Sequence, residues 1–384
     1  MISVKKLQIK FYFFTLLVLA LQIVFKPYNY LMMIGLFFIF TISIFSKETR
    51  QAFLKFKYIN LFLIIFLFFL LFISVAKDND FSLALRFYTI LILILLAYFV
   101  PLDSSLIKGF IFISLIQAII VFSFYIYLSL FHNLDSYIPL REYFKDNQLG
   151  DIFTYNGQRW YVQIKGNAVL PIAFMLSFYY LKGFFGKLLS LLFAISIICA
   201  GNFAFLLVIL LVIVHGFFII LRPHVFFLIF LFFIFLSICF PDHVINLYES
   251  KLESSIPIRF ESISLLLDFN DLNEALLGKG LGFQLFHMGE YREYTGDIYF
   301  EFQAIYFLSM LGILPFLIYF SILMLLTFHF MRYKYSRIIY IIYLLFASIN
   351  PYFLDTLHIL VIILLISLNK LSNKNEHNIH HSHI

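Results

Sequence analysis

Two polar stretches of the chain place basic and aromatic side chains beside apolar segments. The first contains Arg159, Trp160 and Lys165, directly before the apolar run that begins at Ala168. A guanidinium can hold two phosphate oxygens at once, and aromatic faces stack on sugar rings. These residue types therefore indicate a site for an anionic sugar derivative. They also suit an interfacial belt, in which aromatic and basic side chains only anchor a helix end in a membrane.

The second stretch contains Arg259 and, further along, the sequence Gly-Lys-Gly-Leu-Gly at 278–282. Ser254 or Ser255 suits a helix cap and Pro257 a first helical turn, so we expect Arg259 near a helix N-terminus, where free amides face the same anion. The alternating glycines permit close approach to a ligand or to another helix, although a plain turn is the simpler interpretation. On the first interpretation Lys279 and Gly280 contact substrate.

Other polar side chains lie at the ends of apolar segments. Glu301 is a candidate general base and Gln303 a candidate substrate contact, although a carboxylate here also complements a helix dipole. Arg86 lies about one turn inside an apolar run, which indicates either a substrate site or a side chain that reaches the interface. Asp355 and His358, one turn apart, suit a proton relay, but a satisfied pair explains them more simply.

Composition places these residues in a membrane protein. Of 384 residues, 63% are hydrophobic and 12% are charged, whereas soluble domains carry about 25% charged residues. This excludes soluble enzymes, coiled coils and disordered chains. The net charge of +6 comes mostly from short loops between apolar runs, so we expect no nucleic-acid partner. Cys199 and Cys239 lie inside apolar runs, and no glycine-rich nucleotide motif occurs, so we expect no disulfide, metal or cofactor.

Hydropathy predicts an all-α, polytopic transmembrane bundle that forms a single integral membrane domain over residues 1–384. We expect about twelve spans; eleven result if a weak break at 201–202 or at 350–351 is only a bend. The predicted spans are 11–25, 30–45, 58–75, 82–100, 107–131, 167–181, 186–200, 203–220, 225–241, 301–329, 338–350 and 352–369.

Lys and Arg in the short loops predict that both termini are cytoplasmic. Two long polar loops, 132–166 and 242–300, then lie on the far side of the membrane, and 370–384 forms a cytoplasmic tail. The second loop carries ten acidic and four basic residues. Because its mean field repels anions, any diphosphate must be bound locally by individual arginines.

These motifs resemble the bacterial O-antigen polymerase family, whose superfamily also contains the O-antigen ligases. The resemblance consists of three segments: Arg159-Trp160 with Gly166-Asn167 and Leu170-Pro171, Ile258-Arg259-Phe260 leading to Leu-Leu-Gly-Lys-Gly-Leu-Gly-Phe at 276–283, and Glu301 to Gly312. The layout with two long loops covers the whole chain, and the motifs cover about a third of it.

The resemblance implies a metal-independent glycosyltransferase at the periplasmic face of the bacterial inner membrane. It would join undecaprenyl-diphosphate-linked oligosaccharide repeat units into polysaccharide, with membrane lipids, a chain-length regulator and a flippase as further partners. Arg159 and Arg259 would stabilise the leaving diphosphate and Glu301 would act on the acceptor hydroxyl. Arg86, Trp160, Lys165, Lys279, Gly280 and Gln303 are the predicted substrate contacts.

Three alternatives remain open at this point: a ligase, a flippase, and a structural or scaffold membrane protein, in which no single loop residue would be essential. The ligases, which transfer glycan to lipid A-core, carry a His shortly before the glycine that corresponds to Gly312, and this chain has Glu301-Phe302 there. A flippase for lipid-linked oligosaccharides would line its cavity with charges inside the spans, where only Arg86 and Asp355 stand out. The polymerase is therefore the preferred hypothesis.

Overall fold

The structure, a computed structural model, is a mostly helical protein. It describes residues 4–22, 24, 28–100, 102–103, 105–133, 136–155, 159–220, 256–298 and 300–368. The helices are α1 (Val4–Ala20), α2 (Tyr28–Ile44), α3 (Lys47–Lys55), α4 (Lys57–Ala76), α5 (Phe81–Ala97), α6 (Ser105–Phe131), α7 (Ile138–Asp146), α8 (Val169–Tyr180), α9 (Gly183–Ala200), α10 (Phe203–Ile220), α13 (Ile256–Leu267), α14 (Leu272–Leu277), α15 (Gln303–Leu311), α16 (Ile313–Phe330), α17 (Lys334–Ile349) and α18 (Thr356–Ser367).

Four helices, α4, α6, α9 and α16, are long and apolar enough to cross a membrane. A fifth span results if α2 and α3, which are bent by 80° at their junction, are taken together. The prediction of about twelve spans is therefore wrong for the described part of the chain. The predicted span 225–241 and the tail 370–384 lie outside the described residues.

Helix length explains part of this difference, because hydropathy counts apolar runs and does not show where a helix begins and ends. Gly312 has φ +74° and divides the predicted span 301–329 into α15 and α16. Helices α8 and α18 have 12 residues each, a rise of about 18 Å against about 30 Å of hydrocarbon. Such helices are apolar because they are buried in protein.

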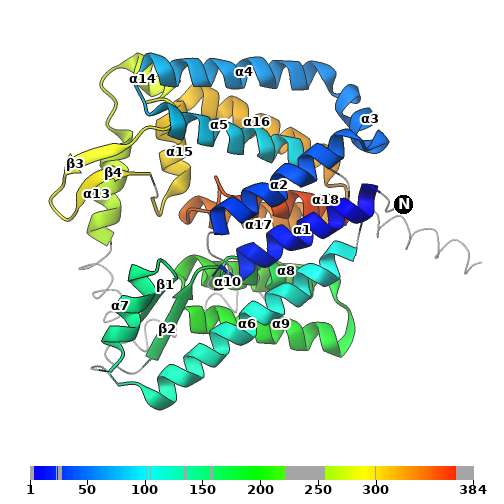
Figure 1. Ribbon diagram of the computed structural model, residues 1–384, viewed down its shortest axis with the longest axis vertical. Helices are drawn as coiled ribbons and strands as arrows, with labels where there is room; N and C mark the ends of the chain where they lie inside the picture. Colours follow the sequence, from blue (N-terminus) through cyan, green and yellow to red (C-terminus); the bar gives the residue numbers. More distant parts are fainter. Residues whose placement is uncertain are drawn as a thin grey trace, which may run out of the picture.

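Helix α18 shows this most clearly. Every residue from Leu357 to Ser367 is buried, since the helix packs against α1, α5, α6 and α17. A helix that is apolar on all sides belongs in a core, whether or not lipid surrounds the whole. In Figure 1 α18 lies in the middle of the molecule, and the longer helices run side by side around it.

The two polar loops contain β-hairpins, which corrects the all-α prediction. Strands β1 (Gly150–Tyr155) and β2 (Arg159–Ile164) pair antiparallel, and so do β3 (Leu285–Met288) and β4 (Glu293–Asp297). In β2 the alternate residues Trp160, Val162 and Ile164 are buried. This period of two is the strand signal that hydropathy alone overlooks.

Both hairpins lie at the same end of the helices, which run side by side as a layer. Figure 1 shows β1, β2 and α7 on the left of the molecule, and β3, β4, α13 and α14 on the left as well. The start of α1 and the bent helix α3 lie on the opposite side. The fold therefore gathers the polar elements of both loops at one end of the helices.

Candidate functional site

Arg259 and Glu301, which are 42 residues apart in the chain, form an ion pair. Arg259 Nε donates to Glu301 Oε2, and the two side chains are 33% and 58% exposed. Both groups are thus held together at the surface and open to a ligand. A guanidinium beside a carboxylate provides an anion contact and a proton acceptor within one site.

Helix α13 positions Arg259. It begins at Ile256, with Pro257 in its first turn as predicted, so Arg259 lies one turn inside the helix start. The predicted caps Ser254 and Ser255 lie outside the described residues. The helix packs against α15, at whose entrance Glu301 lies in a bend.

Glu261, two residues after Arg259, fixes the β3–β4 hairpin to α13. Its Oε1 accepts the backbone N–H groups of Glu290 and Tyr291, the latter at 3.2 Å, and its Oε2 accepts the Tyr294 hydroxyl at 3.3 Å. The carboxylate therefore caps the hairpin turn. The sequence analysis did not identify Glu261, because no local spacing shows that a turn 30 residues away folds back on it.

Two aromatic rings continue this connection to Glu301. Tyr294 and Phe300 are buried and stack with centroids 6.4 Å apart, and Phe300 lies 5.0 Å from the ring of Tyr306 on α15. Glu301 directly follows Phe300. The hairpin thus sets where Glu301 lies relative to Arg259.

Gln303 opens α15 and is buried, so its amide faces protein. Its Oε1 accepts the backbone N–H groups of Phe353 at 2.7 Å and Leu354 at 3.2 Å. These bonds attach the turn before α18 to the entrance of α15. Gln303 was predicted to contact substrate. In this structure its side-chain oxygen instead bonds to the protein and holds two elements of the site together.

The same turn brings Asp355 near Arg86. Asp355 directly precedes α18 and is half-buried, and Arg86, exposed on α5, exerts an electrostatic attraction on its carboxylate. Helices α5 and α18 pack together. A second pair of opposite charges therefore lies at the end of the helices where Gln303 joins α15 to the 353–355 turn.

The glycine-rich segment 278–283 is enclosed between α4, α5 and α15. Lys279 N donates to Ser309 O at 2.8 Å, and Asn79 Nδ2 donates to Lys279 O at 2.9 Å. Gly280 has φ +89°, and a Cβ there would lie 3.0 Å from Ser74 Cα. The close approach that the glycines permit is thus to neighbouring helices of the same chain.

The Lys279 side chain is only 8% exposed. Its Nζ donates to Leu265 O at 3.2 Å and lies 4.9 Å from the ring centroid of Phe283. Burial lowers the pKa of the Lys279 amine, and the nearby Glu274 and Asp268 oppose that shift. Lys279 therefore ties α13 to the glycine-rich segment as a buried cation over an aromatic ring.

The first hairpin holds the remaining predicted residues. Arg159 begins β2 with its backbone opposite Tyr155; its side chain lies outside the described part of the structure. Trp160 is buried edge-on against Tyr137, with centroids 5.1 Å apart. Lys165 follows β2 and its backbone N–H donates to Leu149 O at 2.8 Å. The structure thus brings Arg259 and Glu301 together, whereas Trp160 lies in the other hairpin and Lys165 directly after it.

A bidentate ion pair stabilises this hairpin. Arg141 on α7 holds both oxygens of Asp151 on β1, at 2.8 and 2.9 Å. The bonds to Asp151 raise the pKa of the Arg141 guanidinium above its ordinary value. This pair joins α7 to the hairpin through two nitrogens of Arg141. Arg259, by contrast, contacts Glu301 through Nε alone.

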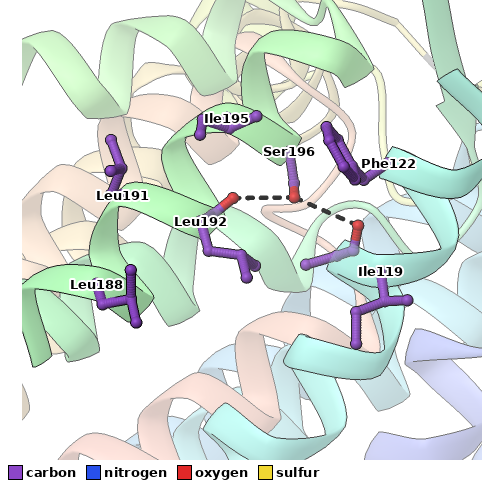
Figure 2. Close-up of a pocket in the computed structure, with 8 residues that line it drawn as sticks. Ile119, Phe122, Leu188, Leu191, Leu192, Ile195 and Ser196 are labelled. Carbon is purple, nitrogen blue, oxygen red and sulfur yellow. Dashed lines mark hydrogen bonds between the residues drawn. The ribbon is translucent and has the colours of Figure 1, made fainter. Parts of the chain in front are cut away.

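A groove between α6 and α9 has a cavity volume of about 270 Å³ (Figure 2). Its lining is apolar apart from Ser196, whose hydroxyl donates to Leu192 O at 3.0 Å and lies 3.3 Å from Ala118 O. Figure 2 shows both bonds as dashed lines. The described lining of the groove therefore offers a sugar or a phosphate no charged group, and its one hydroxyl is already bonded to backbone carbonyls.

Comparison of the chain with protein-family models, with curated proteins and with solved structures gives no match.

Proposed function

We propose that this chain is an O-antigen polymerase: a membrane glycosyltransferase that joins undecaprenyl-diphosphate-linked oligosaccharides at the periplasmic face of the bacterial inner membrane. One observation carries the proposal. Arg259 and Glu301, both chosen from the sequence as catalytic candidates, form an ion pair at the surface. Arg259 belongs to α13, which lies at the end of the helices where both hairpins lie (Figure 1).

The proposed reaction is a single displacement at the anomeric carbon of the donor sugar. The acceptor hydroxyl oxygen forms a bond to that carbon, and the bond from carbon to the diphosphate oxygen breaks, so the electron pair leaves with the diphosphate. Arg259 stabilises the charge that develops on the leaving group. Glu301 accepts the proton of the acceptor hydroxyl.

The surrounding elements supply orientation in this proposal. Gln303 holds the entrance of α15 to the turn before α18. Lys279 bonds the glycine-rich segment to α13, and Glu261 bonds the hairpin to the same helix. The first-turn amides of α13 add positive potential beside Arg259. Contacts of substrate with Arg86, Arg159, Trp160 and Lys165 remain predictions.

Deletion of the gene in the native host, with surface lipopolysaccharide separated on a silver-stained gel, tests the function. We expect the ladder to collapse to core plus a single repeat unit, restored by the wild-type gene. Loss of all repeats with accumulation of lipid-linked polymer would identify a ligase instead. Loss of all repeats from the core, with unpolymerised units retained on the cytoplasmic face, would identify a flippase.

The same strain tests the residues. Arg259→Ala, at wild-type membrane levels, should fail to restore the ladder, because loss of one anion-stabilising donor slows such chemistry about 10²–10³-fold. Arg292→Ala is the matched control: Arg292 lies in the same loop, over the ring of Tyr294. A normal ladder from Arg259→Ala would remove Arg259 from the mechanism.

A further inference from the structure

Only one nitrogen of the Arg259 guanidinium contacts Glu301. Among the described residues, Nε donates to Oε2, and the Nη groups have no protein acceptor. The Arg259 side chain is partly exposed and that of Glu301 is exposed, in contrast to the buried Lys279. An anion can therefore approach the outer edge of the guanidinium while the carboxylate is still beside it.

The net charge of the Arg259–Glu301 pair determines how it responds to a diphosphate. One guanidinium balances one carboxylate, so the pair is neutral when empty. A diphosphate adds about two negative charges, and one guanidinium cannot balance both groups at close range. The anion with the higher charge and more oxygens competes with the carboxylate for the same donors.

The other acidic side chain on α13 is already bonded to the hairpin and is not a counter-ion of Arg259. Glu261 is the other acid near Arg259 on α13, and its two oxygens accept three donors of the hairpin. Glu301, by contrast, lies in a bend outside α15, where its side chain can turn away without breaking a helical hydrogen bond.

We propose that Glu301 is the internal counter-ion of an anion site on Arg259, and that binding of the donor diphosphate releases Glu301 to act on the acceptor hydroxyl. This inference rests on the proposed function. Base and anion site are then coupled, so the donor binds before the acceptor is deprotonated. In the empty protein the carboxylate stays neutralised by Arg259.

Binding of inorganic pyrophosphate to the full-length protein in nanodiscs, measured by isothermal titration calorimetry at low ionic strength, tests the exchange. Glu301→Gln should bind pyrophosphate about fivefold more tightly than wild type, since it removes one exposed competing ion pair. Arg259→Ala should lose the binding. Asp151→Asn, which removes the carboxylate of the Arg141 pair, is the matched control and should bind like wild type.

Equal or weaker binding by Glu301→Gln would overturn the counter-ion role, as would tighter binding by Asp151→Asn to the same degree. A second assay separates this inference from the proposed function, because pyrophosphate binding needs no polymerisation. Suppose that the wild-type protein does not lengthen lipid-linked repeat units, but Glu301→Gln still binds pyrophosphate more tightly than wild type. The polymerase function would then be wrong, and the anion exchange at Arg259 would stand. Both results positive would support the coupled mechanism.

Discussion

At the scale of single residues, the site depends on a carboxylate that contacts no predicted reacting group. Glu261 accepts from Glu290 N, Tyr291 N and the Tyr294 hydroxyl, and so holds the hairpin whose ring stack ends beside Glu301. Two neighbouring side chains of one helix turn thus have different contacts: Arg259 pairs with Glu301, and Glu261 bonds to the hairpin.

Glu261→Ala should weaken docking of the hairpin by about 1–2 kcal/mol, because a charge-assisted acceptor for partly exposed donors is lost. Because the hairpin then no longer holds Glu301 in place, polymer length on the gel should fall, while the amount of the variant protein in the membrane stays near that of wild type. Glu290→Gln is the control, since Glu290 contributes its backbone N–H and its side chain is exposed. Normal polymer from Glu261→Ala would show that the hairpin does not position Glu301.

At the scale of elements, the glycine-rich segment packs so closely against α4, α5 and α15 that its glycine positions leave no room for a Cβ. Gly280→Ala should destabilise the protein by more than 2 kcal/mol, because φ +89° is strained for alanine and its Cβ would meet Ser74 and Asn79.

Gly183 provides the matched control for this substitution. It has φ +80°, but no atom lies within 4 Å of a built Cβ. Gly183→Ala therefore carries the backbone strain without the clash and should lower the thermal unfolding midpoint less than Gly280→Ala does. Equal effects of the two substitutions, measured in the same detergent, would show that the enclosure of Gly280 has no energetic role.

A buried polar chain stabilises the α17–α18 packing. His358 Nδ1 lies 2.7 Å from Phe353 O and its Nε2 lies 2.8 Å from the Tyr340 hydroxyl, and both rings are fully buried. His358→Phe should cost about 1–3 kcal/mol, because it leaves buried polar groups without a partner.

A double-mutant cycle tests the pairing of these two side chains. Adding Tyr340→Phe to His358→Phe removes one of the orphaned groups, so the double variant should lose less stability than the sum of the two single variants. Strict additivity in thermal unfolding would contradict a coupled pair. The sequence analysis paired His358 with Asp355, whereas in the structure the two ring nitrogens of His358 bond to Phe353 O and to the Tyr340 hydroxyl.

At the scale of the whole molecule, composition was enough to predict a mostly helical protein with helices apolar enough to cross a membrane. Local spacing was enough to place Arg259 near the start of α13. The span count failed, because hydropathy cannot distinguish lipid-facing helices from a short helix such as α18 that is buried in protein. The pairing of Arg259 with Glu301 was also beyond prediction, since it depends on how the β3–β4 hairpin folds back on α13.

The arrangement of the helices makes a topological prediction. Helix α7 and the β3–β4 turn lie at one side of the layer and α3 at the other, as Figure 1 shows. If the layer crosses the membrane, Glu142 on α7 and Tyr291 in the turn are on the periplasmic side and Arg50 on α3 is on the cytoplasmic side. All three positions are exposed.

Single cysteines at these positions, in a chain with Cys199 and Cys239 replaced by serine, test this arrangement. A membrane-impermeant maleimide added to cells with a permeabilised outer membrane should label Glu142→Cys and Tyr291→Cys, and should label Arg50→Cys only after lysis. The physical reason is the basic α3, since Lys and Arg near span ends favour the cytoplasmic side. Labelling of Glu142→Cys and Tyr291→Cys from opposite sides would place the two hairpins across the bilayer from each other, and Arg259 and Arg159 could then not act on one diphosphate.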